Sequence, residues 1–343
     1  SGSFTPGNFL YTDSFGNVLS APTSILGGGG SGWGLTGNAG TDDTANFIGT
    51  TDAQAFNIAT NGNLIGSFGL SGNVALSSET YIPFFGTTLP ASTASGDASF
   101  ATGVAGDASG VGSFVFGIFG QASGLGSVAG TGSIASGDGS FALGGGVASG
   151  VGSTSWSTAT ASGRGSMAWG GGSSGAETEA SGQNATAWGY GMFAPSYQET
   201  AFGNFGTLYT PSSSLGFLSQ DRLFSIGNGS EFSRHNAFTM QKSGSFVFND
   251  DNYTWDSGEE NKFFFNYDNQ SIRIGSVDDD RWDPTNVGNK SIALGFAISG
   301  TAPAPMASGL ASFAVGPGAT ASNSGAIAMG LGSLASGETS FAA

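Results

Sequence analysis

The chain of 343 residues contains no cysteine and only one histidine, His235. Without cysteine it can form neither a disulfide nor a thiolate metal site. A single histidine also excludes, within one chain, a serine–histidine–aspartate triad and any metal site that needs two imidazoles. His235 stands between Arg234 and Asn236, in a polar stretch typical of a solvated turn. No set of residues forms a catalytic motif, and we expect a protein that is not an enzyme.

Basic residues are scarce as well. Eight Lys and Arg stand against 24 Asp and Glu, which gives a formal net charge of −16. So few cations cannot neutralise a row of phosphates, and the composition therefore argues against a nucleic-acid partner. All eight lie between Arg164 and Lys290, and seven of them between Arg222 and Lys290. No apolar run approaches the roughly 20 residues that cross a bilayer, so we expect no membrane contact in this segment.

Glycine is abundant, with 62 residues, and it recurs within a short repeat. The triplet Ala-Ser-Gly begins at positions 94, 108, 122, 135, 148, 161 and 180, with a variant at 194, and the same register resumes at 307, 321 (Ala-Ser-Asn) and 335. Within each block the steps are 13 or 14 residues, except for one of 19. A fixed period of this length predicts a solenoid of short stacked strands.

The sixth to tenth positions of each unit read Ser, apolar, Ala, apolar, Gly, as in Ser140-Phe141-Ala142-Leu143-Gly144. This alternation predicts a strand whose seventh and ninth side chains share one face, and the glycine permits the bend that follows. We expect that face to be the buried core, with identical positions of successive units forming a ladder. The ladder comprises Phe100, Phe114, Phe141, Trp156, Trp169, Trp188, Phe313 and Met329.

Such coils leave a single chain with a thin core, so we expect association of identical chains with cyclic symmetry. The segments "SFATGVAGDASG", "SIALGFAIS", "SFAVGPGATAS" and "AIAMGLGSLASG" resemble the head repeats of trimeric autotransporter adhesins. The resemblance covers residues 94–206 and 286–343. It implies a left-handed parallel β-roll and three chains packed side by side. The steps of 13 and 19 residues and the Phe and Trp replacements depart from the family pattern.

The regions outside the repeats form further segments of the chain. Residues 27–32, "GGGGSG", indicate a flexible joint, and residues 204–287 contain alternating stretches separated by Gly and Asn turns, which predict an antiparallel meander. The fold class is therefore all-β: parallel β-roll (β-solenoid) blocks with an inserted antiparallel β-meander that projects from the rod or threads through it. The expected segments are 1–32, extended with the joint; 33–93, a short β module; 94–203, the first repeat block; 204–285, the inserted domain; and 286–343, the second repeat block.

An acidic run offers the strongest candidate for a metal ligand set. Asp278, Asp279, Asp280 and Asp283 could hold Ca²⁺ through carboxylate oxygens, although the spacing is not that of an EF-hand. The alternative is a solvated turn. No other cofactor is indicated.

These features favour a structural and adhesive segment of a long extracellular fibre or cell-surface appendage. Parts of residues 33–62 and 222–229 also resemble modules of fibre and tail proteins, which leaves the shaft or receptor-binding part of a phage-like tail fibre as the alternative. The expected partners are identical chains, in a trimer by the resemblance, and a cell-surface or carbohydrate receptor. The last residues, "SGETSFAA", stop part-way through a repeat, and we expect a longer polypeptide.

Overall fold

The computed structural model describes residues 8–12, 14–22, 41–42, 44, 47–171, 177–250, 260–277, 279–298 and 300–343. The expected glycine-rich joint and Asp278 lie outside these residues. The chain forms two compact units, Ser1–Phe56 and Asn57–Ala343. In the first unit, β1 (Asn8–Thr12) and β2 (Val18–Pro22) form an antiparallel hairpin. The second unit holds all the repeats.

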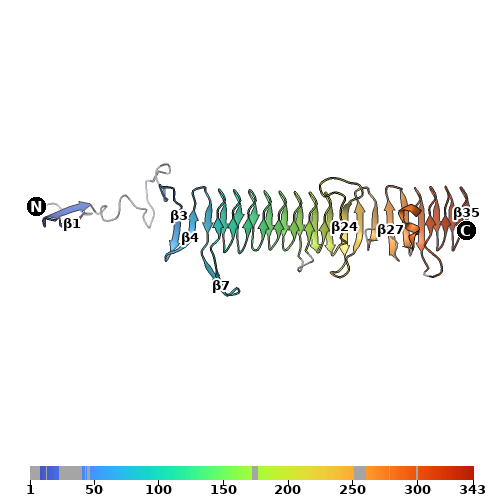
Figure 1. Ribbon diagram of the computed structural model, residues 1–343, viewed down its shortest axis with the longest axis horizontal. Helices are drawn as coiled ribbons and strands as arrows, with labels where there is room; N and C mark the ends of the chain where they lie inside the picture. Colours follow the sequence, from blue (N-terminus) through green and yellow to red (C-terminus); the bar gives the residue numbers. More distant parts are fainter. Residues whose placement is uncertain are drawn as a thin grey trace. The chain divides into compact units, whose positions relative to one another are not determined.

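The repeats form coils that stack one on the next, and each coil contributes one strand to each of two parallel sheets (Figure 1). This confirms the all-β class and the parallel β-solenoid. The first short sheet has eight strands. They are β8 (Thr93–Ala94), β10 (Asp107–Ala108), β12 (Gln121–Ala122), β14 (Ile134–Ala135), β16 (Val147–Ala148), β18 (Thr160–Ala161), β20 (Glu179–Ala180) and β22 (Phe193–Ala194).

The opposite wall of the coils belongs to a sheet that we call the long sheet, because it runs through the whole second unit. Its parallel strands in the first repeat block are β5 (Val74–Leu76), β9 (Phe100–Thr102), β11 (Phe114–Val115), β13 (Val128–Ala129), β15 (Phe141–Leu143), β17 (Thr154–Trp156), β19 (Met167–Trp169), β21 (Thr186–Tyr190) and β23 (Thr200–Asn204). At the N-terminal end, β3 (Phe56–Thr60) and β4 (Asn63–Phe68) extend this sheet, and β4 is antiparallel to β5. A separate hairpin, β6 (Thr80–Ile82) and β7 (Thr87–Leu89), lies between β5 and β8.

The Ala-Ser-Gly triplet has a clear structural role in the short sheet. Its alanine points into the coil and is fully buried, as in Ala135 and Ala148. Its serine points outward, and its glycine lies against the next coil. A Cβ added to Gly137 would lie 2.1 Å from the carbonyl oxygen of Gly150, so a side chain there would force these two coils apart. The sixth-position serine then closes the turn: Ser127 Oγ donates to the Gly124 carbonyl at 2.7 Å.

The interior of each coil is filled by alanine, and not by the large side chains. The eighth-position residues Ala101 and Ala142 are 0% exposed and pack with first-position alanines such as Ala108 and Ala148. The expectation that the seventh and ninth side chains fill the interior is therefore wrong, because the two walls of a coil lie too close for aromatic rings. The predicted ladder side chains point outward; Phe100, Phe114, Phe141, Trp156 and Phe313 are half-buried, and Trp169, Trp188 and Met329 are exposed.

The expected meander threads through the stack. After β23 the long sheet continues through β24 (Arg222–Asn228), which is parallel to β23, and then through antiparallel neighbours. These are β25 (Asn236–Gln241), β26 (Phe246–Asp250), β27 (Glu260–Asn266) and β28 (Ser271–Val277). Four reversals restore the original strand direction, so β29 (Ile292–Phe296) pairs parallel to β28 and coiling resumes.

The second repeat block repeats the architecture of the first. Its long-sheet strands after β29 are β31 (Phe313–Val315), β33 (Ile327–Met329) and β35 (Phe341–Ala342), and its short sheet consists of β30 (Met306–Ala307), β32 (Thr320–Ala321) and β34 (Leu334–Ala335). Between β28 and β29, the 3-10 helices η2 (Asp280–Trp282) and η3 (Pro284–Asn286) lie where the short sheet is interrupted. Trp282 of η2 packs with Phe264, Val247 and Val277 in a local core of larger side chains.

Candidate interaction face

The outer surface of the long sheet carries two parallel rows of uncharged, mostly apolar side chains, which we call lane 1 (seventh positions) and lane 2 (ninth positions). In the first repeat block the exceptions are Thr154, Thr186 and Thr200 in lane 1 and Thr102 and Gly130 in lane 2. In lane 1, Phe100 pairs in register with Phe114, and their ring centroids lie 5.3 Å apart. In lane 2, Trp156, Trp169 and Trp188 occupy successive coils. The centroids of Trp169 and Trp188 lie 5.1 Å apart, with 6° between the ring planes. The predicted ladder therefore exists, but on the outside of the chain.

Both lanes continue without a break through the meander. Phe224 and Ile226 of β24 are in register with Thr200 and Phe202 of β23, which places them in lanes 1 and 2. On the following strands, lane 1 passes through Met240, Phe246, Phe265 and Ile272, and lane 2 passes through Phe238, Phe248, Phe263 and Ile274. The parallel strands then carry the lanes on through Ile292 and Leu294 to Phe313 and Val315.

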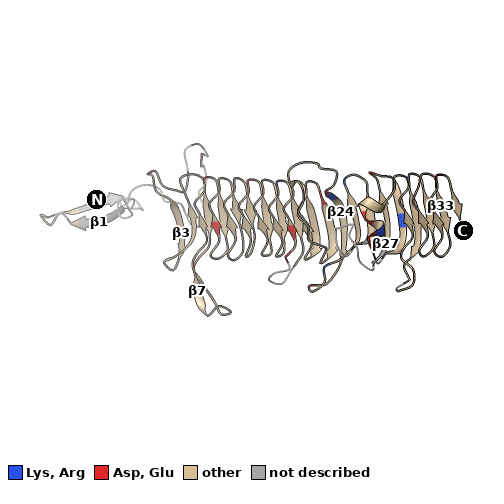
Figure 2. Cartoon of the chain, turned by 45° about the vertical axis from the view of Figure 1, so that its right-hand side comes forward, with Lys and Arg blue, Asp and Glu red and all other residues tan. Residues whose placement is uncertain are grey.

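The lanes are uncharged and largely accessible in the single chain. Trp188 is 57% exposed, and Phe248 and Ile274 are exposed by 44% and 42%. No Asp, Glu, Lys or Arg occupies a lane position on the described strands from β5 to β35. Figure 2 shows how few charged residues the coil stack carries. A large exposed and mostly apolar surface marks an interaction site.

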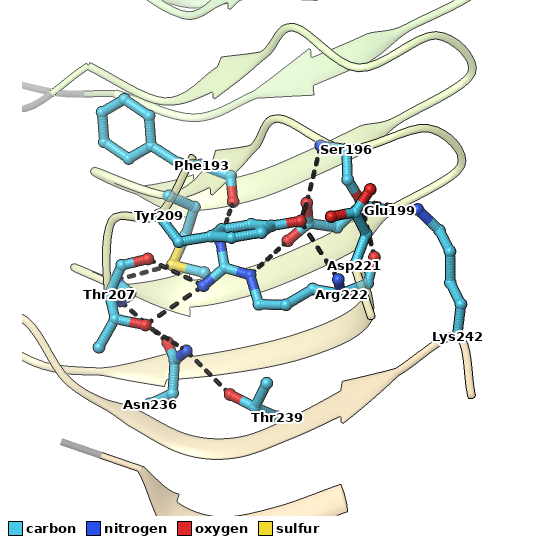
Figure 3. Close-up of polar contacts among 12 residues, drawn as sticks. Phe193, Ser196, Glu199, Thr207, Tyr209, Asp221, Arg222, Asn236, Thr239 and Lys242 are labelled. Atoms are coloured by element: carbon cyan, nitrogen blue, oxygen red, sulfur yellow. Dashed lines mark hydrogen bonds and ion pairs between the residues drawn. The ribbon is translucent and has the colours of Figure 1, made fainter. Parts of the chain in front are cut away.

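A buried ion pair lies on the inner side of the long sheet, at the junction between the first coil block and the meander (Figure 3). Arg222 Nε and Glu199 Oε1 are 2.9 Å apart, and both side chains are essentially inaccessible. The other oxygen of Glu199 accepts bonds from the Ser196 amide at 3.0 Å and from the Tyr209 hydroxyl at 3.3 Å. The guanidinium lies 3.8 Å from the centre of the Tyr209 ring. The carboxylate is therefore held from three sides.

The same guanidinium closes the end of the first short sheet. Arg222 donates to the Thr207 carbonyl at 2.9 Å and to the Phe193 carbonyl at 3.4 Å. Phe193 belongs to β22, the terminal strand of that sheet, which has no further coil beside it. The guanidinium thus supplies a donor where a neighbouring strand is missing. Buried backbone carbonyls need such a partner.

Further polar residues complete this junction. Lys242 Nζ donates to Ser196 Oγ at 2.9 Å, and Ser196 Oγ donates to the Arg222 carbonyl at 2.7 Å. Asp221 accepts the backbone amides of Ser212 and Ser213 at 2.6 and 2.9 Å, which fixes the segment between β23 and β24. These bonds tie the connection 205–221 to the sheet.

Burial is the main cause of the pKa shifts of the ionisable residues at this junction. It raises the pKa of Glu199, against the charge of Arg222 and the hydrogen bonds from Ser196 and Tyr209. It also raises the pKa of Tyr209, with a smaller contribution from the neighbouring Glu199, and lowers the pKa of Lys242. Strongly shifted pKa values occur at catalytic sites and in structural ion-pair networks alike. Because Glu199 and Arg222 are closed to solvent, we assign them a structural role.

A second buried arginine lies at the other end of the meander. Arg273 is 0% exposed and donates to the Ser291 carbonyl at 3.1 Å, to Ser291 Oγ at 2.9 Å and to the Ala307 carbonyl at 2.9 Å. Ala307 belongs to β30, the first strand of the second short sheet. No carboxylate within salt-bridge distance of Arg273 is found among the described residues, and burial lowers its pKa to about 10. Arg222 and Arg273 therefore cap the two interrupted ends of the short sheets.

The sequence pattern contains a signal for the second buried arginine, Arg273. Ser271-Ile272-Arg273-Ile274-Gly275 is in register with Ser291-Ile292-Ala293-Leu294-Gly295, so Arg273 occupies the inward alanine position of a repeat unit. A charged residue between two outward apolar residues of an alternating strand faces the core. Glu199 carried no comparable signal.

The expected calcium ligands Asp279 and Asp280 accept hydrogen bonds from neighbouring groups of the protein. Asp279 accepts the Arg281 amide at 3.0 Å, and its carboxylate pairs with Arg281 Nε at 3.2 Å. Asp280 begins η2, and the Asp283 amide donates to the Asp280 carbonyl. Within the described part of the chain, no group of three or more His, Cys, Asp or Glu side chains is placed to hold a metal ion. His235 contacts Asn228 through its ring Nδ1, at the base of a loop.

Comparisons with known proteins assign no identity to this arrangement. No family model matches the chain, and no curated protein matches its sequence. Among the described residues, no helix has the length and apolar character needed to cross a membrane.

Proposed function

We propose that this chain is a structural and adhesive segment of an extracellular fibre, in which identical chains associate side by side through lanes 1 and 2. Three chains are expected from the resemblance to the adhesin head repeats. The observation that carries the proposal is the unbroken, uncharged pair of lanes across both repeat blocks and the meander.

Covering the lanes is energetically favourable because apolar surface contributes about 25 cal/mol per Å² when it leaves water. An identical chain is a suitable cover. Its stacked strands have the same spacing of about 4.8 Å, so rows of side chains on two copies can interdigitate over their whole length. A small globular partner would cover the lanes over only a few strands and leave the rest of the lanes exposed.

The inward alanines support a rod rather than an enclosing fold. Because alanine and glycine fill the interior, each coil leaves no cavity for a substrate, and further coils only extend the stack. Length, stiffness and repeated presentation of surface are what such a stack provides.

The adhesive role is tested by comparing cells that carry the gene with cells that lack it. We expect loss of attachment to surfaces or to other cells on deletion, with the protein detected on intact cells by antibody. Unchanged attachment contradicts the adhesive role. Antibody labelling of released phage-like particles in place of cells would assign the chain to a tail fibre.

A further inference from the structure

Several insertions that lengthen single coils emerge at one edge of the stack. The β6–β7 hairpin lies between β5 and β8, and residues 300–305 lie between β29 and β30. The connection 205–221 reaches the opposite edge, where the Ser213 and Ser214 carbonyls accept backbone hydrogen bonds from Tyr197 and Gln183. The loop 229–235 follows β24, which runs parallel to the coil strands and ends at the same edge. Figures 1 and 2 both show the β7 hairpin and one loop near β24 projecting from this edge, and another loop near β24 at the opposite edge. Insertions gathered on one face of a repeat protein often form its binding face.

The hairpin presents an aromatic ring at its tip. Phe84 is 90% exposed, whereas its neighbour Phe85 packs edge-on against Phe119, two coils further along the stack, with centroids 5.6 Å apart. The amides of Phe85 and Gly86 both donate to the Ile82 carbonyl, which closes the turn. Phe85 is therefore the anchor, and Phe84 is the ring held out to solvent.

The loop after β24 is built in the same way. Phe232 is 95% exposed at the tip of a turn that Ser230 and Ser233 close by two backbone hydrogen bonds. Arg234 fixes the base of the loop, because its guanidinium donates to the Gly191 carbonyl at 2.7 Å and to the Gly206 carbonyl at 3.2 Å. A rigid base with one exposed aromatic tip is a pre-organised contact.

The separation of the two tips restricts the ligand. Nine inter-strand steps, roughly 43 Å at about 4.8 Å each, lie between β5 and β24. The hairpin tip reaches over two of these steps to Phe119, so about seven steps, roughly 34 Å, separate the two tips along the stack. An ordinary protein interface covers about 800 Å² per partner, so one globular protein does not engage both tips in such a patch. A polymer with a repeating structure can.

The chemistry of the hairpin tip favours an uncharged ligand, whereas the loop of Phe232 also carries Glu231 and Arg234. Residues 80–89 contain no charged side chain, and exposed Thr87 and Thr88 supply hydroxyl groups beside Phe84. A net charge of −16 opposes a polyanion. An aromatic ring with adjacent hydroxyl groups matches a sugar ring, which has apolar C–H faces and a rim of hydroxyls.

We infer that the insertion edge is a binding site for a neutral polysaccharide, contacted by Phe84 and Phe232 at two points of the same rod. Two weak contacts on one rigid body raise the overall affinity, because the second becomes intramolecular once the first has formed. The inference rests on the proposed adhesive role and names its ligand class and its contact residues.

The test uses the full 343-residue chain and a panel of immobilised neutral glucans, mannans, galactans and N-acetylglucosamine polymers. We expect the parent chain to bind at least one polymer, and F84A/F232A to bind it at least about tenfold more weakly. The matched control is L125A/L310A, which removes two exposed apolar side chains of the opposite edge and should bind like the parent. Leu125 and Leu310 are 57% and 52% exposed.

The assembly mass and melting temperature of each variant are measured in parallel. The inference is overturned if the parent binds no polymer, or if both double variants lose binding equally. It is also overturned if F84A/F232A loses binding together with a changed assembly mass or a lower melting temperature, since that result would place the tips between copies. Phe84-dependent binding to phosphatidylcholine vesicles without polymer binding also overturns it. If the parent is a monomer and still binds a polymer through Phe84 and Phe232, the proposed side-by-side association of chains is contradicted, whereas the polysaccharide site at this edge is supported.

Discussion

Trp169 and Trp188 stack on the outside of adjacent coils, with 5.1 Å between ring centroids and 6° between ring planes, while the alanines beside them, Ala168 and Ala187, fill the interior. This arrangement places the large side chains where another chain can cover them. The stability of the single coil and the association of chains therefore depend on opposite faces of the same strand. The two faces can be tested separately.

Enlarging an inward residue should destabilise the coil itself. Ala142 is 0% exposed between the two walls, and A142L would overpack this space at a cost of about 3 kcal/mol, at the upper end of such changes. Hydrogen exchange of the amides in residues 128–156 measures the effect locally. The outward L143M is the control and should leave exchange unchanged. Equal protection in A142L and the parent would contradict the assignment of the interior.

Most of the fold followed from the sequence, because the Ser-apolar-Ala-apolar-Gly pattern fixes both the strand and its period. The pattern does not say which face is inside. Alternation separates Phe141 from Ala142, but the distance between the walls decides that the alanine is buried, and the local pattern does not encode that distance. Large side chains were therefore assigned to the wrong side.

The polar junctions were harder to predict. Arg273 could have been found from its place in a repeat unit, but its carbonyl partner Ala307 lies 34 residues away. The pairing of Glu199 with Arg222 depends on how the chain closes the first coil block, and no local pattern encodes it. Sequence spacing gives strands, whereas contacts between interrupted sheet ends require the three-dimensional stack.

The two buried arginines should respond differently to removal. R222M leaves the Glu199 carboxylate buried without its counter-ion, and we expect a loss of about 3 to 5 kcal/mol in the free energy of unfolding. R273M removes a buried charge that no carboxylate neutralises among the described residues, and should cost less than about half as much. Denaturant unfolding of both variants measures the difference. Equal losses would contradict the role of the ion pair.

The pH dependence of R222M follows from Glu199. Burial raises the pKa of this carboxyl, and removal of the opposing guanidinium raises it further. An acid whose folded pKa lies above its unfolded value costs stability when ionised, and this cost disappears as the pH falls through the folded pKa. The free energy of unfolding of R222M relative to the parent should therefore increase as the pH falls through the raised pKa of Glu199. A relative stability that decreases as the pH falls would contradict the assignment.

Charge placed in lane 2 should prevent association without unfolding the coil. Trp188 is 57% exposed in the single chain, so W188D leaves no buried charge there, whereas in an assembly it would bury an unpaired carboxylate. We expect W188D to retain the circular dichroism of the parent and to lose at least about tenfold in association affinity. S149D, on the outer face of the short sheet, is the control and should associate normally. Normal association of W188D would contradict burial of lane 2.

The central claim, that identical chains cover the two lanes, is tested most directly by the mass of the intact chain in solution. Sedimentation equilibrium at micromolar concentration should give a multiple of the 34.0 kDa chain mass, with three copies expected from the family resemblance. A closed oligomer with another number of copies would overturn the expected trimer but would still agree with lanes covered by identical chains. A folded, stable monomer with its tryptophans open to a solvent quencher would contradict the account.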